Sequence, residues 1–137
     1  MSAANSLPWN DASIRVTLPI RTISENNARE HWASRAKRRK GQREVVHLVL
    51  PMHMRTCKPV APFAITLVRI APRRLDSDNL QGALKAVRDQ VAEELGINDG
   101  DPAHEWRYEQ RHYDKNRREL GLQVGGYGVE VRVESRR

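Results

Sequence analysis

The stretch that decides the fold is residues 63–95, FAITLVRIAPRRLDSDNLQGALKAVRDQVAEEL. Residues 63–70 are almost continuously apolar, which is typical of a strand buried on both faces, so we expect this strand near the middle of a sheet. Residues 80–95 repeat their apolar side chains at intervals of three and four, which predicts an amphipathic helix. The stripe consists of Leu80, Leu84, Val87, Val91 and Leu95. Gly96 follows where a helix C-cap glycine belongs.

Outward from this stretch, the other elements are predicted by shorter patterns. Alternating apolar side chains predict strands at residues 14–18 and 129–133, and residues 104–113 are expected to form another strand. Residues 32–50 are expected to be a helix with a basic first half and an apolar second half. The order strand, helix, strand, helix, strand, strand predicts an α/β (α+β) fold, with a small mixed β-sheet and two main helices in two layers.

Length and composition limit the classes of protein to consider. The 137 residues suit a single domain, which we place at residues 14–137 after a flexible N-terminal lead at 1–13. With 24 Lys and Arg against 17 Asp and Glu, the formal net charge is +7, which favours nucleic acid as a partner. No apolar run approaches the roughly 18 residues that span a bilayer, and we expect neither a signal peptide nor a membrane partner. Cys57 is the single cysteine, which excludes an internal disulfide and favours a reducing cytoplasm.

Acidic residues gather before, within and after the helix at 80–95. They are Asp76, Asp78, Asp89, Asp99 and Asp101, with Asn79 and Lys85 between them. Each has an ordinary structural interpretation, such as a helix N-cap, a turn, or an exposed ion pair four residues apart. On one continuous helix, however, Asp78, Lys85 and Asp89 would lie within roughly 40° of one another, nearly opposite the apolar stripe.

The combination predicts a metal-dependent catalytic site. Asp76 from a strand end, Asp78 from a helix start, and Asp99 or Asp101 from a later loop would converge. Converging carboxylates suit Mg²⁺, with Mn²⁺ as the alternative, and such an ion promotes the hydrolysis of phosphodiesters. Lys85 would stabilise negative charge that develops on the phosphate.

Basic residues surround this acidic segment and predict contacts with DNA phosphates. Arg73 and Arg74 directly precede Asp76, and most of the others lie before or within the helix at 32–50. The predicted DNA-binding residues are Asn27, Arg29, Arg35, Lys37, Arg38, Arg39, Lys40, Arg73 and Arg74. We interpret Trp32 as an anchor at the start of this helix, with base stacking as the alternative.

These motifs resemble those of the RusA family of Holliday junction resolvases. The similarity rests on Asp76-Ser77-Asp78-Asn79, the following helix with Lys85 and Asp89, the acidic turn at 99–101, and the segment Ser24-Glu25-Asn26-Asn27. It extends from about residue 14 to 133, and the part from 76 to 101 is the most specific. In the family, the lysine lies about one helical turn after Asp-Asn, where this chain has Gly82.

The resemblance implies a homodimer with a mixed sheet that uses Mg²⁺ and resolves four-way DNA junctions by paired nicks. By this resemblance, Asp76 and Asp78 are metal ligands, either Asp99 or Asp101 completes the site, and Lys85 is the catalytic lysine. Asn79 and Asp89 support these residues. Other branched DNA remains a possible substrate of such an enzyme.

Two other functions fit the residues less well. A non-catalytic nucleic-acid-binding module would use the same basic surface, with the acidic residues serving only as caps and turns. A phosphotransferase or phosphatase is disfavoured because the chain lacks a Gly-rich phosphate loop. Among the remaining side chains, we expect Trp106 and Tyr108 in the core or a dimer interface. We expect surface or DNA-facing positions, rather than metal ligation, for His31, His104 and His112.

Overall fold

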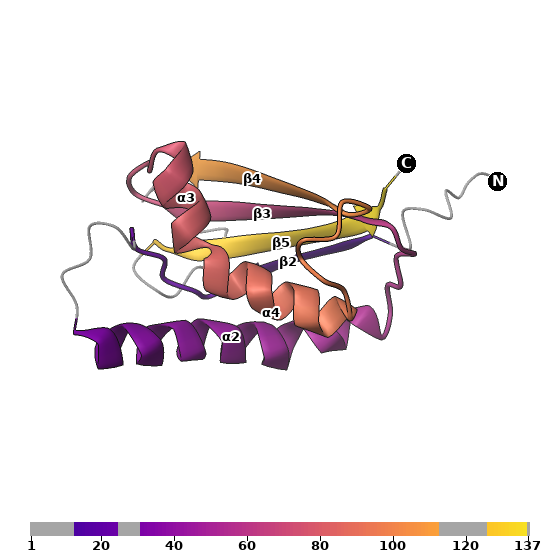
Figure 1. Cartoon of the computed structure of the whole chain (residues 1–137), viewed down its shortest axis with the longest axis horizontal. Coiled ribbons are helices and arrows are strands. Elements are labelled where there is room, and N and C mark those ends of the chain that lie inside the picture. Colours follow the sequence, from indigo (N-terminus) through magenta and orange to yellow (C-terminus); the bar gives the residue numbers. More distant parts are fainter. Residues whose placement is uncertain (1–12, 25–30, 113–125, 137) are drawn as a thin grey trace.

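The structure is a computed structural model that describes residues 13–24, 31–112 and 126–136. Within these ranges the chain forms an α+β fold, with a mixed four-stranded sheet and three helices in two layers (Figure 1). The strands are β2 (Ile14–Leu18), β3 (Phe63–Ala71), β4 (Glu105–His112) and β5 (Gly128–Ser135). The helices are α2 (Trp32–Met54), α3 (Ser77–Ala83) and α4 (Lys85–Leu95). The predicted mixed sheet is therefore confirmed, and the elements follow the predicted order except that two helices, α3 and α4, stand where one was expected.

The sheet has the strand order β2-β5-β3-β4. Strand β3 is parallel to β4 and antiparallel to β5, and β5 is antiparallel to β2. All nine residues of β3 are buried, which confirms the interior position predicted from its continuous apolar sequence. Because β3 and β4 are parallel, α3 and α4 carry the chain from the end of β3 back to the beginning of β4.

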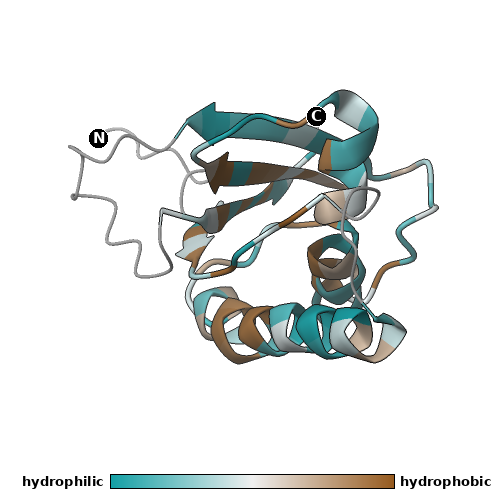
Figure 2. Cartoon of the chain, turned by 90° about the vertical axis from the view of Figure 1, so that its left-hand side faces the viewer, coloured by the Kyte–Doolittle hydropathy of each residue, from teal (hydrophilic) through white to brown (hydrophobic). Residues whose placement is uncertain are grey.

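The hydrophobic core lies between the helices and one face of the sheet (Figure 2). Ile65 and Leu67 of β3 and Val131 of β5 belong to the same buried cluster as Leu50 of α2 and Val87 of α4. Each is fully buried, and burying a side chain of this size stabilises the fold by about 1.5–3 kcal/mol. Alternate residues of the strands point to the opposite face, where no described helix packs (Figure 2).

The helix predicted at 80–95 is two helices, which corrects the expectation of two main helices in the fold. Leu80, Leu84, Val87 and Val91 of the apolar stripe are buried as predicted and Leu95 is partly buried, but α3 ends at Ala83 and α4 begins at Lys85. Leu84 lies between them with φ −100° and ψ 1°, outside the helical region, and the two helices run in different directions (Figure 1). The angular position predicted for Asp78 relative to Lys85 on one continuous helix is therefore wrong. Gly96 does cap α4, in the left-handed conformation with φ 68°.

Helix α2 is longer than predicted, since it continues through Gly41 and Pro51 to Met54. Val46 and Leu50 face the core, and the Gln42 side chain donates a hydrogen bond of 3.0 Å to the carbonyl oxygen of Arg21. The helix thereby holds the segment that follows β2. Among the described helices, none has the length and apolar character needed to cross a membrane.

Candidate functional site

A chain of side-chain hydrogen bonds organises the segment between β3 and α3. Asp76 is the N-cap of α3, and its carboxylate accepts hydrogen bonds from the Asn79 backbone N–H (2.9 Å) and from Asn79 Nδ2 (3.0 Å). The hydroxyl of Ser24 donates to Asn79 Oδ1 at 2.9 Å. The structure therefore brings Ser24 to the predicted Asp76–Asn79 motif, although 55 residues separate it from Asn79, and the rest of the predicted segment, residues 25–27, lies outside the described residues.

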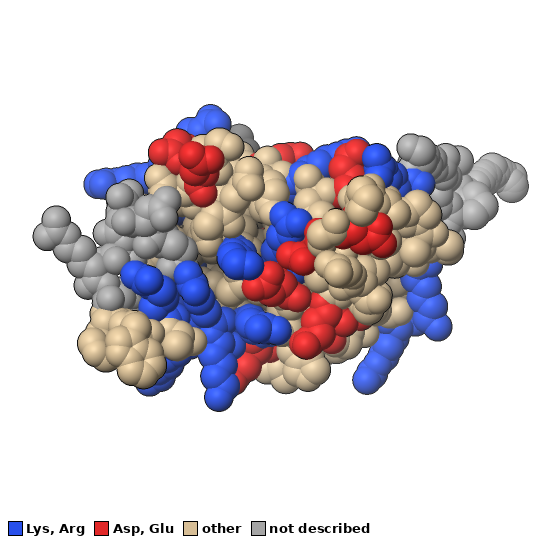
Figure 3. All heavy atoms as spheres, in the orientation of Figure 1, with Lys and Arg blue, Asp and Glu red and all other residues tan. Residues whose placement is uncertain are grey.

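Asp78 lies in the first turn of α3 and is exposed, as are Asp76, Arg73 and Arg74. On the face drawn in Figure 3, acidic side chains gather over α3 and along α4, and basic side chains gather over the first half of α2. Acidic and basic side chains therefore share this face, but the acidic side chains over α3 lie apart from those along α4 (Figure 3).

A buried arginine supports this segment from within the domain. Arg69 of β3 is only 4% exposed, and it donates hydrogen bonds to the Thr22 hydroxyl (2.8 Å) and to the Arg73 carbonyl oxygen (2.6 Å). Burial lowers the pKa of its guanidinium from the ordinary value. Arg69 thus ties the segment after β2 to the segment after β3. Sequence reasoning missed it, because an arginine in an apolar run gives no indication of its partners.

A pocket of about 320 Å³ lies beside α3, α4 and β4. Its lining residues are Gln81, Gly82, Lys85, Arg88, Asp99 and Tyr108. Gln81 and Gly82 are three and four residues after Asp78, so they lie on the neighbouring turn of α3. Lys85 is exposed at the pocket and lies 3.4 Å from the Asp89 carboxylate, which confirms the ordinary interpretation of that pair.

Arg88 fixes Asp99 at this pocket. Its guanidinium lies 4.7 Å from the centre of the Trp106 ring and donates hydrogen bonds to the Tyr108 hydroxyl and the Asp99 carbonyl oxygen, the latter at 2.8 Å. Its Nε is also 3.4 Å from the Asp99 carboxylate. Trp106 and Tyr108 pack against the core, as predicted. Sequence reasoning missed Arg88, which resembles an ordinary surface residue of α4.

Asp101 lies at the opposite end of the sheet from Asp76. Gln110, near the end of β4, forms two hydrogen bonds with the backbone of Leu75, at 2.7 and 2.8 Å. The Asp101 carboxylate instead lies 3.8 Å from the ring of His104, just before β4. The six steps from residue 104 to 110 span about 20 Å of extended strand. Within one chain, Asp101 therefore does not reach the start of α3. Of the two alternatives, Asp99 is the one that lines the pocket beside α3.

The predicted convergence of the carboxylates is not found within the part of the chain that the structure describes. No group of three or more Asp, Glu, His or Cys side chains there is arranged to hold a metal ion. Asp76 and Asp78 lie together at α3, Asp99 lies by the pocket, and Asp101 lies at the far end. The expectation failed because it assumed that the loop after α4 returns to the start of α3, whereas the loop runs to the start of β4.

The predicted DNA-binding residues of α2 line its first half, where Lys37 and Lys40 are exposed and Arg35, Arg38 and Arg39 are half-buried. Asn27 and Arg29 lie outside the described residues. Trp32 is 74% exposed, which corrects its interpretation as an anchor.

The three histidines differ in their environments. His31 and His112 are exposed, as expected. The His104 side chain is only 7% exposed, and its Nδ1 accepts a hydrogen bond of 3.0 Å from the backbone N–H of Phe63. The surface position predicted for His104 is therefore wrong, because this ring is a structural link between the beginnings of β3 and β4.

A second charged cluster lies on the sheet face that the helices leave uncovered. Glu130 of β5 is 3% exposed, and its carboxylate lies 3.1 Å from Arg15, 2.5 Å from Arg132 and 3.5 Å from Arg111. Burial raises the pKa of Glu130, but the hydrogen bonds and charges of these arginines outweigh it and leave the pKa below the ordinary value. This carboxylate is enclosed by its own counter-charges, so we assign it a structural role.

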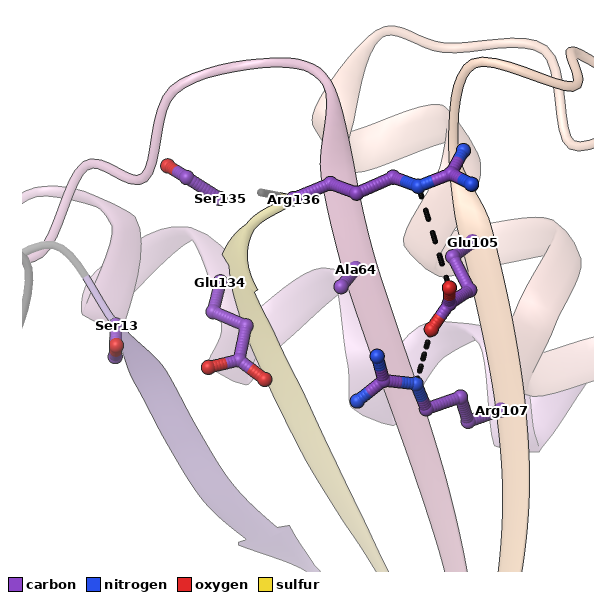
Figure 4. Close-up of a pocket in the computed structure, with 7 residues that line it drawn as sticks. All are labelled: Ser13, Ala64, Glu105, Arg107, Glu134, Ser135 and Arg136. Atoms are coloured by element: carbon purple, nitrogen blue, oxygen red, sulfur yellow. Dashed lines mark hydrogen bonds and ion pairs between the residues drawn. The ribbon is translucent and has the colours of Figure 1, made fainter.

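A hollow of about 330 Å³ continues this face at the end of the sheet (Figure 4). Ala64 of β3 leaves space between Glu134 on one side and Glu105 and Arg107 on the other (Figure 4). Glu105 forms ion pairs with Arg107 and with Arg136, the latter at 4.0 Å. Because its charges largely pair with one another, we do not place the functional site here.

Comparison with known proteins leaves the family open. No protein-family model matches the chain, and no curated protein matches its sequence.

Proposed function

We propose that this protein is a metal-dependent endodeoxyribonuclease that cuts branched DNA, including four-way Holliday junctions, by hydrolysing phosphodiesters. The observation that carries the proposal is the exposed pair Asp76 and Asp78 at the start of α3, where Asn79 binds Asp76 and Ser24 binds Asn79, with the exposed Arg73 and Arg74 just before them in the chain. The resemblance to the RusA family, carried by the same residues, supports the choice of substrate.

The donor chemistry of Asp76 and Asp78 fits Mg²⁺, with Mn²⁺ as the alternative. In proteins, Mg²⁺ keeps several waters and is commonly held by one or two carboxylates together with substrate phosphates. The two residues therefore suffice without Asp101. A divalent ion held there would supply neutralisation of the phosphate and activation of a water molecule.

The other residues of the site would bind and orient the DNA. Lys85 is exposed at the pocket beyond Asp78, where its ammonium group would stabilise charge on the phosphate. Arg88 holds Asp99 at the same pocket, and Arg73, Arg74 and the first half of α2 would bind the DNA backbone. We further propose a homodimer, because a twofold axis relates two identical sites and so suits paired, symmetric nicks.

The decisive experiment is a nicking assay on a labelled four-way junction, with and without Mg²⁺, beside linear duplex of the same sequence. We expect Mg²⁺-dependent cuts in the junction. Asp78→Asn should lower the rate by roughly 100-fold or more, the scale of losing a charge-stabilising group, and should keep junction binding. Asp101→Asn is the matched control and should keep the wild-type rate.

Two outcomes would contradict this proposal. If Asp78→Asn cuts at the wild-type rate, the acidic pair is not the catalytic centre. If the wild-type protein binds junctions but cuts them in no divalent metal, the alternative of a non-catalytic DNA-binding module replaces the nuclease.

A further inference from the structure

The start of α2 presents an aromatic side chain to solvent instead of burying it. Trp32 is 74% exposed, and its ring lies 5.4 Å from the ring of His31, at an angle of 35°. His31 is the N-cap of α2, where its Nδ1 accepts a hydrogen bond of 3.2 Å from the Ala33 N–H. The cap therefore fixes the His31 ring, and the Trp32 ring lies beside it with most of its surface exposed to a partner.

A line of basic side chains leads away from this ring along α2. Arg35, Arg39 and Arg43 follow Trp32 at intervals of three, seven and eleven residues, so all four lie on one side of the helix. Lys40 is adjacent and exposed. From Trp32 to Arg43 the helix rises about 16 Å. The first turn of α2 itself carries no acidic residue.

The line ends in a groove of about 470 Å³ between α2 and α4. Its α2 side carries the basic residues Arg39, Lys40 and Arg43 together with Ala36, Glu44 and His47, and Gln90 and Glu93 line its α4 side. Arg43 donates a hydrogen bond of 2.9 Å to Gln90 and lies 3.8 Å from Glu93. The acidic residues of the groove, Glu44 and Glu93, thus lie near Arg43, at the end of the line away from Trp32.

We propose that Trp32 and this groove bind an unpaired DNA strand, with Trp32 stacking on one base and the basic side chains of α2 following the backbone. An exposed aromatic ring combined with a basic groove is the arrangement by which proteins hold single strands, because every base has a face that can stack. In continuous duplex the base faces are covered by their neighbours, so Trp32 distinguishes unpaired from paired DNA. This inference deepens the proposed nuclease function by specifying substrates that contain an unpaired stretch.

Binding in the absence of divalent metal tests this inference separately from cleavage. A labelled oligothymidylate and a blunt duplex of equal length are titrated with the full-length protein in EDTA, and binding is followed by fluorescence anisotropy. We expect Trp32→Ala to weaken oligothymidylate binding by roughly tenfold, as for the loss of one stacked base, and to change duplex binding less than twofold. Trp32→Phe should retain most of the affinity.

The matched control is Leu48→Ala, because Leu48 is also an exposed apolar residue of α2, at 69%, but lies outside the basic line. It should leave both affinities unchanged. Oligothymidylate should also quench the tryptophan fluorescence of the wild-type protein, and this quenching should be smaller in Trp32→Phe. The inference is overturned if Trp32→Ala weakens both ligands equally or neither, or if the quenching persists in Trp32→Phe. A junction nuclease whose Trp32→Ala variant binds oligothymidylate normally would keep the proposed function and lose this inference.

Discussion

Two groups of carboxylates in this small domain are held in opposite ways. Glu130 lies almost fully buried on the uncovered face of the sheet, enclosed by Arg15, Arg111 and Arg132. Asp76 and Asp78 lie exposed at the start of α3, and within the described residues Asp76 is bound by uncharged groups of Asn79. In the first arrangement, arginines of the same fold neutralise the negative charge. In the second, the negative charge remains available to a cation or a substrate. The density of charge alone therefore does not mark a functional site.

The largest effect on stability should come from removing the buried carboxylate of Glu130. Glu130→Ala leaves three arginines without their shared carboxylate, and we expect a loss of about 3 kcal/mol in the free energy of unfolding. This is the low end for a broken buried ion pair, because the three arginine side chains are 30–65% exposed and can regain water. Urea unfolding measures the loss. Glu109→Ala is the control, since Glu109 is 51% exposed and lies 3.8 Å from Arg132 alone. If Glu130→Ala and Glu109→Ala lose the same free energy of unfolding, the structural role of Glu130 is contradicted.

The pH dependence of stability should test the same contrast between the buried Glu130 and the exposed carboxylates of α3. The pKa of Glu130 in the folded state is below the ordinary value of 4.5. The unfolded state therefore binds the proton more tightly, so this residue stabilises the fold above about pH 4.5 and loses that contribution as the pH falls through its folded pKa. Urea unfolding at pH 6 and at successively lower pH should show a decline that is smaller in Glu130→Gln. An identical decline in both proteins would refute the role of Glu130.

A smaller effect on stability should separate the two roles of Asp76. Asp76→Ala removes the N-cap of α3 and should cost about 1 kcal/mol in urea unfolding. Asp76→Asn keeps a side chain that caps helices equally well but removes the negative charge, so stability should change by less than about 0.5 kcal/mol. If Asp76 is available for catalysis as proposed, Asp76→Asn should nevertheless lose junction cleavage. Normal cleavage by Asp76→Asn would mean that Asp76 acts as the N-cap of α3 and has no part in catalysis.

The fold was predictable where the sequence is periodic. Alternation along β5, the continuous apolar run of β3 and the stripe from Leu80 to Leu95 each predict which apolar side chains pack in the core, because the hydrophobic effect favours their burial. The break at Leu84 was not predictable, because Leu84 continues the apolar stripe and its spacing does not record a change of direction. Gly96 was predictable because the left-handed conformation favours glycine.

The candidate site was predictable in its residue types but not in its geometry. The motif from Asp76 to Asn79 and the basic first half of α2 are visible in the sequence, and the structure places Ser24 against Asn79. Asp99 and Asp101 lie apart because Arg88 binds Asp99 on one side of the loop, whereas Asp101 lies beside His104 on the other side. Arg69 is equally hidden, since its partners are a hydroxyl and a carbonyl oxygen on two distant segments. Such partnerships depend on the folded path of the chain, which local patterns do not specify.

The position of β5 has a consequence for how the sheet assembles. This strand comes after all the other described strands in the chain, yet it lies between β2 and β3, which have no direct pairing with each other. Its pairing with β2 joins Ile14 to Val133, so the closure spans most of the chain. Contacts of such long sequence separation slow folding, because the entropy of loop closure is lost before the contacts form. The sheet therefore cannot begin as a local hairpin between β2 and β3. It is complete only after β5 has paired with both of these strands.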